Sequence, residues 1–466
     1  MSKTRALRPA TDSTLDPAGS AADSPAGGRG RPPRILIVGG GYVGLYTAMR
    51  LLKKLRDDEA VVTVVDPRSY MTYQPFLPEA AGGSVSPRHV VVPLRRVLRG
   101  AEIITGRVTG IEHSTKQATV APLEGAPYTI EYDVLVSAVG SISRTLPIPG
   151  LAQWATGFKT VEEAIQLRNR VLECLDIAES TRDVAVRERN LTVVVVGAGY
   201  AGVEAMAELQ DMARYATRYF RSIKQSDLRF LLVEASRTVL PEVGPEMGRW
   251  TLEELIARGI DVKLDTRLES CVDGHVELSD GTRVDAETVI WTAGVRAHPV
   301  LENSDLPLDE RGKLRCTSTL QVDGVDDAWG AGDSASVPDL TKAEGSTCAP
   351  NAQHAVRQSK ALADNIVAAL RGKRLTPYSH KYVGSVAGLG LYKGVANVYG
   401  IKVKGWPAWF MHRTYHLSRV PTLSRKARVV ADWTLALFFK REIVSLWSMH
   451  EPFHEFRDAA KDRHAA

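Results

Sequence analysis

Two glycine-rich segments carry the spacing that nucleotide phosphates require. The first, Gly39-Gly40-Gly41-Tyr42-Val43-Gly44, follows the apolar run Arg34–Val38 and precedes a helical pattern over residues 45–55. In such a turn the first glycine permits the tight bend, the second lets the backbone approach a pyrophosphate, and the third packs helix on strand. The helix N-terminus adds unpaired N–H groups and a partial positive charge. This segment therefore predicts a dinucleotide site.

An acidic residue follows at the expected distance. The apolar run Ala60–Val65 ends at Asp66, 22 residues after Gly44. A carboxylate at the end of the second strand accepts hydrogen bonds from ribose hydroxyls. Asp66 completes the first dinucleotide fingerprint.

The same pattern recurs about 158 residues later. Strand Leu191–Val196 leads into Gly197-Ala198-Gly199-Tyr200-Ala201-Gly202, and strand Leu228–Val233 is closed by Glu234. A carboxylate repels a 2′-phosphate, so Glu234 favours NADH over NADPH. The run Asp133–Gly140 also returns, as Thr288–Gly294. Two elements repeated at nearly one offset indicate a duplicated domain.

The predicted fold is α/β, with two Rossmann-type dinucleotide-binding domains, the second inserted in the first, and a C-terminal membrane-associated region. Short alternating runs at Gln117–Ala121 and His275–Leu278 predict a β-meander in each domain, and Thr317–Val322 predicts a further strand. A helix is expected over residues 351–370. The predicted boundaries are a disordered tail (1–33), the first part of the first dinucleotide-binding domain (34–160), the second dinucleotide-binding domain (161–312), the second part of the first domain (313–380) and the C-terminal region (381–466).

Composition excludes several classes of protein. With 44% hydrophobic and 24% charged residues, the chain of 466 residues is typical of globular proteins rather than fibres. A net charge of +5 is too small to indicate nucleic-acid binding. The first 33 residues have no apolar core of a secretory signal, and no run of about 18 apolar residues predicts a spanning helix. The four cysteines form no CxxC pair, so we expect buried structural thiols.

These motifs resemble the two-dinucleotide flavoproteins and, within them, the type II (non-proton-pumping) NADH:quinone oxidoreductases, over roughly residues 34–450. The resemblance implies FAD in the first domain and NADH in the second. It also implies that Gly332-Asp333 is a second FAD motif, whose Asp333 binds the ribityl chain. The cofactor-binding residues expected on this basis are Gly39, Gly41, Tyr42, Val43, Gly44, Asp66, Val108, Gly140, Gly197, Gly199, Gly202, Glu234, Gly294, Gly332 and Asp333.

Several segments are similar to the type II branch in particular. They are the loop 73–83, the strand 291–295, the helix start Ala352-Gln353-His354-Ala355-Val356-Arg357-Gln358 and the strand 384–390. The resemblance implies that Gln353 faces the quinone and that Gln358 belongs to the same site. The sequence departs from the family at Ser359, where a glycine is usual, and at Val383, where a lysine is frequent.

Three residues are candidates for the reaction itself. Glu204, just after the second glycine turn, either orients the nicotinamide and handles protons or is a carboxylate stabilised by the helix N-terminus. Gln353 either donates to a quinone carbonyl or packs its helix against backbone. Gln358 is the third candidate.

The predicted reaction passes a hydride from NADH to FAD and then two electrons to a quinone. No metal or protein nucleophile is expected. Flavin disulfide reductases need two cysteines after the first helix, and residues 45–95 contain none. Sulfide:quinone reductases have a cysteine just after the second glycine turn, and residues 203–206 supply none. The alternative is a soluble NADH-dependent flavoprotein or redox sensor with a non-quinone acceptor.

The C-terminal region is basic and aromatic. Residues 381–450 contain eleven Lys or Arg and two Asp or Glu, as well as Trp406, Trp409, Trp433 and Trp447. Trp and cationic side chains together suit anionic headgroups. We therefore expect peripheral attachment to the inner, cytoplasmic face of the cell membrane through Trp406, Trp409, Phe410, Arg413, Arg425, Lys426 and Arg428. A homodimer is also expected, and a dimer interface or a packed C-terminal helix is the alternative use of this region.

Overall fold

The computed structural model describes residues 31–381, 383–439 and 441–445. The chain divides into Met1–Pro32 and Pro33–Ala466, and every element named below belongs to the second unit. All but the last three residues of the expected tail, and also Trp447, lie outside the described residues.

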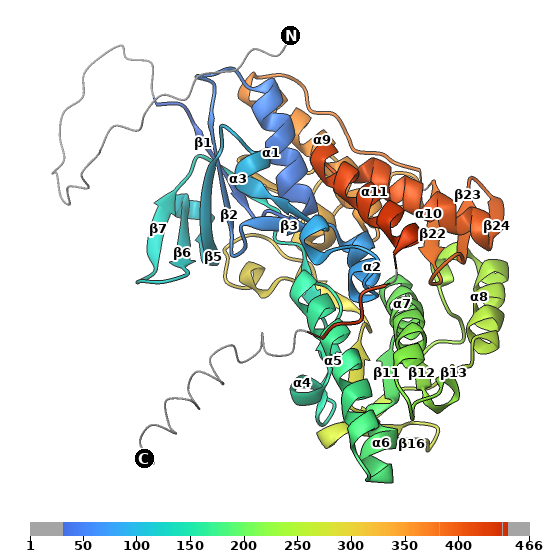
Figure 1. The fold of residues 1–466 in the computed structure, drawn as a ribbon. Helices are drawn as coiled ribbons and strands as arrows, with labels where there is room; N and C mark the ends of the chain where they lie inside the picture. The colour runs from blue at the N-terminus through green and yellow to red at the C-terminus, as the bar shows by residue number, and fades with distance from the viewer. Residues whose placement is uncertain (1–30, 382, 440, 446–466) are drawn as a thin grey trace, which may run out of the picture. The chain divides into compact units, whose positions relative to one another are not determined.

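A seven-stranded sheet contains the first glycine motif (Figure 1). Its order is β20-β8-β1-β2-β5-β6-β7, in which β20 to β5 pair in parallel and β5, β6 and β7 form an antiparallel meander. Ile35, Leu36 and Ile37 of β1 have no exposed surface, as a parallel strand covered on both faces requires. The strands are β1 Arg34–Val38, β2 Val61–Asp66, β5 Glu102–Glu112, β6 Gln117–Pro122, β7 Tyr128–Glu131, β8 Val134–Ser137 and β20 Ala328–Gly330.

Helices α1 (Tyr42–Lys54) and α9 (Ala352–Leu370) pack side by side on this sheet. Ser359, where the family usually has glycine, is fully buried at their contact, and its carbonyl accepts from the Thr47 hydroxyl. A small side chain fills this helix crossing, which gives the departure a structural basis. Shorter elements nearby are β3 Tyr70–Thr72, α2 Leu77–Ala81, β4 Val91–Pro93 and α3 Leu94–Val97.

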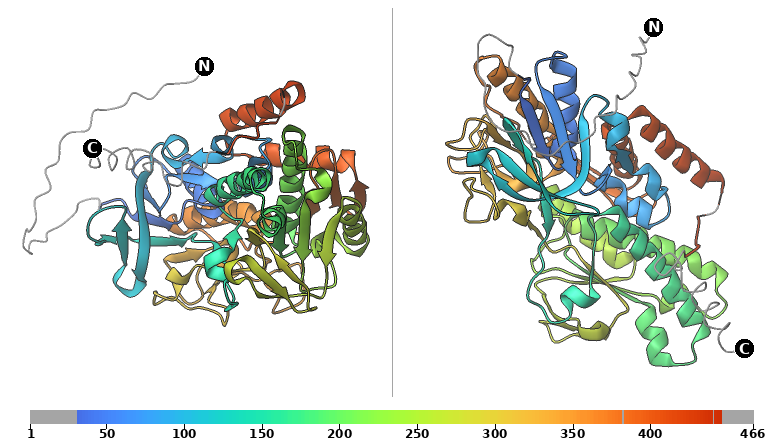
Figure 2. Two further views of the ribbon diagram at one scale, coloured as in Figure 1. Left: turned by 60° about the horizontal axis from the view of Figure 1, so that its bottom comes forward. Right: turned by 90° about the vertical axis from the view of Figure 1, so that its left-hand side faces the viewer.

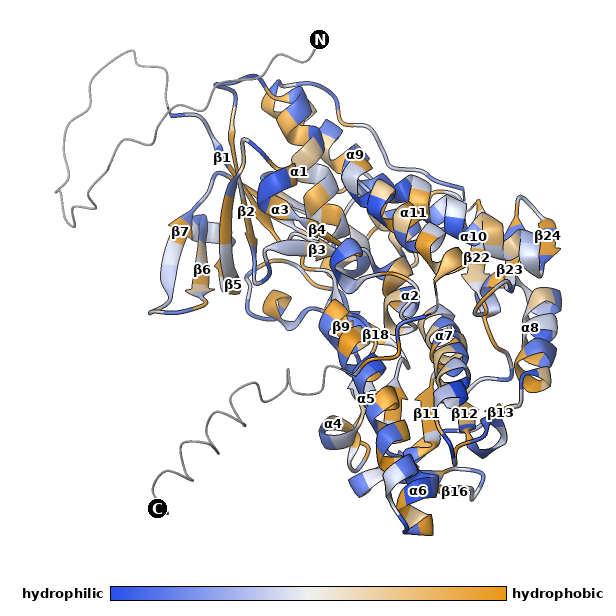
Figure 3. Ribbon diagram, viewed as in Figure 1, coloured by the Kyte–Doolittle hydropathy of each residue, from blue (hydrophilic) through white to orange (hydrophobic). Residues whose placement is uncertain are grey.

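A five-stranded parallel sheet, in the order β10-β17-β11-β12-β13, contains the second glycine motif. Its strands all fall between β8 and β20 in the sequence, so this sheet is inserted in the first. Figure 3 shows β11 as hydrophobic, whereas the surrounding helices carry both classes of residue. The elements are α4 Leu151–Trp154, β10 Thr156–Gly157, α5 Val161–Ser180, α6 Val184–Asn190, β11 Thr192–Val196, α7 Tyr200–Ala216, β12 Arg229–Val233, α8 Pro245–Ala257, β13 Ile260–Lys263 and β17 Thr288–Trp291; β14 Leu268–Ser270, β15 His275–Leu278 and β16 Arg283–Asp285 form the expected second meander.

The C-terminal region begins with an antiparallel sheet on which α10 packs (Figure 2). Among the described residues, no helix has the length and apolar content needed to cross a membrane. The elements are β22 Gly384–Gly388, β23 Gly394–Val398, β24 Ile401–Lys404, α10 Trp406–Arg419 and α11 Leu423–Phe438. Two further strand pairs are β9 Ser141–Ser143 with β18 Val295–Ala297, and β19 Leu314–Arg315 with β21 Ala335–Ser336.

The expected strand at Thr317–Val322 is wrong. Only isolated bridges, Cys316 with Val322 and Gln321 with Trp329, occur there. The Thr317 hydroxyl bonds within the segment, and Leu320 has a φ of +72°, so the chain forms a turn rather than a strand.

Two residues expected at a membrane surface are buried instead. Trp409 and Arg413 are 9% and 8% exposed, and the Arg413 guanidinium lies 4.3 Å from the centre of the Trp409 ring. It also lies 4.9 Å from the centre of the Trp433 ring. The pair fixes α10 and α11 within the molecule, so only part of the aromatic, basic set faces outwards.

Candidate active site

The first glycine turn has the shape that a dinucleotide needs. Gly39 has a φ of +103°, and a Cβ on Gly44 would meet the Gly39 carbonyl oxygen at 1.8 Å. A Cβ on Gly41 would meet nothing within 4 Å, and no side chain caps α1 at this residue. The helix N-terminus is therefore open for phosphate oxygens.

Asp66 lies beside this turn. Its Oδ2 accepts from Gly40 N at 2.7 Å and its Oδ1 from Arg68 N at 2.8 Å. Burial raises the pKa of this carboxyl, although both N–H groups oppose the shift. The carboxylate is oriented by backbone, as expected for a group that receives ribose hydroxyls.

The Gly332-Asp333 turn faces the same region. Asp333 Oδ2 accepts from the Ser141 hydroxyl at 2.7 Å, and that hydroxyl accepts from Lys159 Nζ at 2.5 Å. Gly332 has a φ of +76°, and its N–H donates to Gln358 Oε1 at 2.8 Å. Gln358 is only 1% exposed, so it positions this turn through a direct bond.

An unpaired polar atom indicates room for a bound polar group near this turn. The Ser334 hydroxyl is buried and has no hydrogen-bond partner among the described residues, and the Tyr42 hydroxyl is buried beside the Gln74 backbone. Gly140 has a φ of +67° with open space beside it. Val108, in contrast, is 6% exposed and packs in the core at a register irregularity of β5, so only its backbone is available to a ligand.

The second glycine turn repeats the first. Gly197 has a φ of +107°, and a Cβ on Gly202 would lie 1.8 Å from the Gly197 carbonyl oxygen. Gly199 begins α7 with open space around it. Glu234 Oε2 accepts from Ala198 N at 2.7 Å, the counterpart of Asp66 and Gly40.

The rest of this second site is also open. Glu234 Oε1 accepts from Ser236 N at 2.8 Å, which fixes the carboxylate. Gly294 has a φ of +90°, and a Cβ on this residue would meet nothing within 4 Å, so a ligand can approach its backbone.

Gln353 is engaged by protein groups. Its Nε2 donates to the Gly384 carbonyl at 3.1 Å, and its Oε1 accepts from His380 Nε2 at 3.0 Å and from Val383 N at 3.4 Å. These bonds agree with the packing alternative, while the second N–H of the amide is left for a further acceptor. Val383 meets this site through its backbone N–H.

Glu204 lies between α7 and the C-terminal region. Its Oε1 accepts from Gly388 N at 2.7 Å and lies 3.0 Å from His412 Nε2. Burial opposes the charge on His412, but the neighbouring Glu204 carboxylate raises the pKa of this imidazole overall. Glu204 is thus more than a helix-terminal carboxylate, because it has a titratable partner from α10.

A buried cluster of acids and arginines surrounds this pair, and sequence reasoning missed it. Glu79 lies 3.3 Å from Arg413 Nε and accepts from Trp433 Nε1 at 2.6 Å. Glu208, one turn after Glu204, lies 3.7 Å from Arg441. The three acids and His412 line one small pocket.

The pKa of Glu208 depends on its neighbours in this cluster. Burial raises the pKa of Glu208 to about 7, an effect that Arg441 opposes and Glu79 reinforces. Glu208 Oε2, His412 Nε2 and Arg413 Nε are buried and make no hydrogen bond of good geometry among the described residues, although the last two each lie within 3.3 Å of a carboxylate oxygen. Such atoms suit bound water and exchangeable protons.

The four cysteines are free and buried, as expected. Cys174 and Cys316 lie in the interior, and burial raises the pKa of the Cys174 thiol to about 12. Among the described residues, no two cysteines form a pair beside either glycine turn.

Comparison with known proteins places these features in a family. The pyridine nucleotide-disulphide oxidoreductase family matches residues 33–359. The type II NADH:quinone oxidoreductase Ndh of Mycobacterium tuberculosis is 29% identical over 430 residues, covering 88% of this chain and 90% of that protein. The demethylphylloquinone reductase NdbB of Synechocystis is 30% identical over 409 residues, covering 86% and 95%.

A solved structure has the same fold. NDH2 of Plasmodium falciparum, determined in complex with NADH, superimposes with a TM-score of 0.82 at 18% identity. The match covers 89% of this chain and all of that one. The likeness extends beyond the family match at residue 359 and therefore includes C-terminal structure.

Proposed function

We propose that this chain, which belongs to the type II NADH:quinone oxidoreductases of the pyridine nucleotide-disulphide oxidoreductase family, passes a hydride from NADH to FAD and then two electrons to a quinone. The observation that carries the proposal is the matched pair of open glycine turns. In each, a strand-end carboxylate accepts from the backbone of the turn, Asp66 from Gly40 and Glu234 from Ala198. Two such turns suit two different dinucleotides.

FAD is assigned to the first turn. The N-terminus of α1 at Gly41 would receive the pyrophosphate and Asp66 the ribose, while Asp333 would bind the ribityl chain. When bound, the flavin supplies the two-electron chemistry. The unpaired Ser334 hydroxyl supports a polar occupant here.

NADH is assigned to the second turn. Gly199 precedes α7 and leaves the N–H groups at the start of this helix uncovered for the pyrophosphate. The fixed carboxylate of Glu234 would accept hydrogen bonds from the ribose hydroxyls and exclude a 2′-phosphate. The absence of a cysteine pair beside the turns favours direct transfer between the two cofactors over a dithiol relay.

Quinone reduction by NADH consumes one proton from solution, and Glu204 with His412 is the group assigned to hold it. The 3.0 Å separation and the raised pKa of His412 allow a proton to be shared between them. The pocket shared with Glu79 and Glu208 supplies further sites for exchangeable protons. On the acceptor side, Gln353 keeps one amide N–H for a quinone carbonyl while its other bonds fix residues 380–384.

The C-terminal region is assigned to contact with the cytoplasmic face of a membrane, where NADH is supplied and a lipid-soluble quinone is held. Trp406 and Phe410 are 53% and 52% exposed and stack at 5.6 Å on one side of α10. On α11, Leu423, Leu437 and Phe438 are exposed, and the basic residue Arg428 is exposed on the same helix. Exposed apolar side chains and cations on one helix suit attachment at a membrane interface. A homodimer through the same side chains is the competing use.

Anaerobic rapid mixing tests the proposal. The purified protein is expected to be yellow, to lose its flavin absorbance with NADH, and to regain it when mixed with a quinone. Reduction by NADH followed by no reoxidation with any quinone, while oxygen or a dye reoxidises the flavin, would favour a soluble flavoprotein with another acceptor. A folded protein that takes up no flavin would overturn the assignment entirely.

A further inference from the structure

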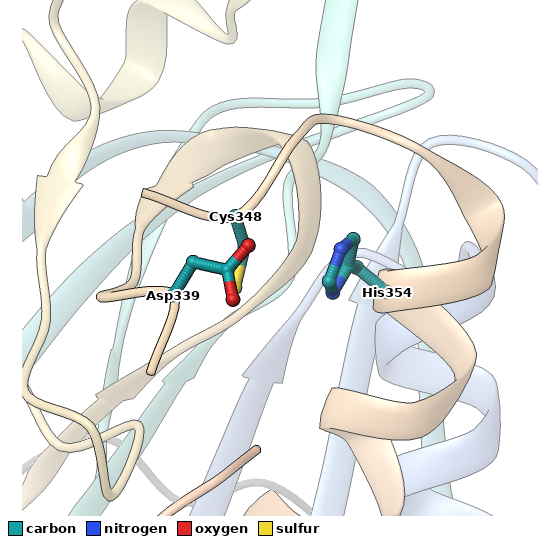
Figure 4. Close-up of side chains that lie close together, drawn as sticks. All are labelled: Asp339, Cys348 and His354. Carbon is teal, nitrogen blue, oxygen red and sulfur yellow. The ribbon is translucent and has the colours of Figure 1, made fainter. Parts of the chain in front are cut away.

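We propose that Asp339, Cys348 and His354 form a binding site for a divalent cation of the zinc class. One donor atom from each side chain lies within 4.8 Å of the donors of the other two. The three residues are 7%, 7% and 4% exposed. Figure 4 shows the Cys348 sulfur against the Asp339 carboxylate, with the His354 ring beside them. A thiolate, an imidazole and a carboxylate are the donors that zinc prefers in proteins.

Two of the donors are held by backbone pairing. The segments around Asp339 and Cys348 form an antiparallel bridge between Pro338 and Thr347. Asp339 N donates to the Ser346 carbonyl, and Cys348 N donates to the Val337 carbonyl, each at 2.8 Å. The two side chains therefore stay close without a metal.

The third donor is fixed from the other side. His354 lies in the first turn of α9, where its N–H donates to the capping side chain of Asn351 at 2.8 Å. Its Nδ1 lies 2.9 Å from the Tyr378 hydroxyl. With Nδ1–H donating to Tyr378, the Nε2 lone pair is available to a cation. Zinc-binding histidines are typically oriented by such a second bond.

Lys342 supplies a positive charge beside the Asp339 carboxylate. Lys342 Nζ lies 3.2 Å from Asp339 Oδ2, while Asp339 Oδ1 is occupied by the Thr341 backbone and hydroxyl. The Lys342 side chain is 56% exposed, so it can turn into solvent when a doubly charged ion arrives. Asp339 Oδ2 would bind the ion, because its present partner, the exposed Lys342 ammonium, can be displaced.

The required rearrangement is small. Zinc bonds of about 2.0–2.3 Å in a tetrahedron place donors roughly 3.5 Å apart, so the side chains must close by about 1 Å. Water would fill the fourth position. The bound ion would tie the 337–348 segment to the first turn of α9, one helical turn before Gln358. Cation binding does not depend on the proposed oxidoreductase activity.

Metal titration of the full-length, flavin-loaded protein tests the site. After treatment with a chelator, the wild type should bind one equivalent of Zn²⁺ in competition with a chromogenic chelator. Co²⁺ should give tetrahedral ligand-field bands at wavelengths beyond the flavin absorption. Cys348→Ser and Asp339→Asn keep the side-chain size and should weaken Zn²⁺ binding about tenfold or more.

Two further variants keep the test decisive. Lys342→Met, on the surface, should tighten Zn²⁺ binding because it removes the competing ammonium. Cys174→Ser, a buried thiol of α5, should leave the Zn²⁺ affinity unchanged. The proposal is overturned if the wild type binds no stoichiometric Zn²⁺, if Lys342→Met leaves the affinity unchanged, or if Cys348→Ser binds as the wild type does.

Discussion

Lys159 and Asp333 are joined through one hydroxyl. Lys159 Nζ lies 2.5 Å from Ser141 Oγ, which lies 2.7 Å from Asp333 Oδ2. Burial lowers the pKa of Lys159, against the attraction of Asp333 and Glu163. The segment after β10 therefore places the amino group of Lys159 beside the turn assigned to the flavin.

Replacing Lys159 by methionine should lower the midpoint potential of the bound flavin. A nearby cation stabilises the electron-rich reduced flavin, so its loss favours the oxidised form. We expect a shift of about 30 mV to more negative values, equivalent to about 1.4 kcal/mol for a two-electron couple. Equilibration with a reference dye measures it, and Lys159→Arg, which keeps the charge, should stay near the wild-type potential. An unchanged potential in Lys159→Met would assign the lysine to domain packing alone.

Replacing Glu234 should relax the choice between NADH and NADPH. Both of its oxygens accept from backbone, so the charge is fixed where a 2′-phosphate would lie. Glu234→Ala should reduce the ratio of kcat/KM for NADH to that for NADPH about tenfold. This corresponds to about 1.4 kcal/mol of repulsion between the carboxylate and the 2′-phosphate. Glu234→Gln keeps an acceptor but removes the charge, and should show the same relaxation. If the wild type already reduces its flavin equally fast with both, Glu234 does not discriminate.

Local patterns predicted the two glycine turns well. Each motif lies within about 30 to 40 residues. The glycine conformations, the strand and the closing carboxylate are therefore determined by residues that are close to one another in the sequence. Asp66 and Glu234 consequently lie where the spacing placed them. The inserted second sheet could also be predicted, because the repeated elements reveal the duplication.

Contacts between distant segments could not be predicted. Glu79 meets Trp433 across 354 residues of sequence, and no periodicity encodes that pairing. Trp406 and Trp409 share one helix, yet only the packing against Arg413 decides which of them is buried. Asp339, Cys348 and His354 have no spacing typical of a metal motif. The bridge between Pro338 and Thr347 brings the first two together, and the start of α9 supplies the third.

Removing the Gln353 amide should separate the two half-reactions. Gln353→Ala loses a donor towards the acceptor and also the bonds to His380 and Gly384. We expect reoxidation of the reduced flavin by quinone to slow about tenfold, as for the loss of one hydrogen bond, with reduction by NADH nearly unchanged. Stopped-flow absorbance resolves both steps. Equal loss in both would indicate that Gln353 only packs α9.

Glu208 should make stability depend on pH. Its pKa rises from 4.5 to about 7 on folding, because burial disfavours the carboxylate. Below pH 4.5 Glu208 is protonated in both the folded and the unfolded protein, so its full contribution to the free energy of unfolding is present there. As pH rises through about 7, this contribution is lost and the free energy of unfolding falls by about 3 kcal/mol. Glu208→Gln is neutral throughout, so its free energy of unfolding relative to wild type should increase from pH 5 to pH 8. Urea unfolding at several pH values measures this difference, and a constant difference would contradict the raised pKa.

The exposed stripe on α11 should bind membranes. Leu437 and Phe438 are 68% and 79% exposed, and Arg428 lies exposed on the same helix. Apolar insertion should persist at high salt, whereas each cation near an anionic surface contributes about 1 kcal/mol that salt screens. We expect the wild type to float with anionic liposomes. Leu437→Gln with Phe438→Gln should reduce flotation at all salt concentrations, and Arg428→Glu should reduce it mainly at low salt.

Charge reversal at Arg428 is the clean electrostatic test of this stripe, because the neighbouring cations Arg425 and Lys426 have partners within the molecule. Arg425 donates to the Arg88 carbonyl and Lys426 to the Ser418 carbonyl, so reversing them would also disturb the fold. Leu123 is a matched control, since it is 76% exposed in a distant turn. Leu123→Gln should float as the wild type does, and equal loss in this control would show that general surface hydrophobicity is being measured. If the wild type does not float but sediments as a dimer that Leu437→Gln with Phe438→Gln dissociates, the stripe is a subunit interface, because the same apolar side chains would then be covered by a second copy of the chain.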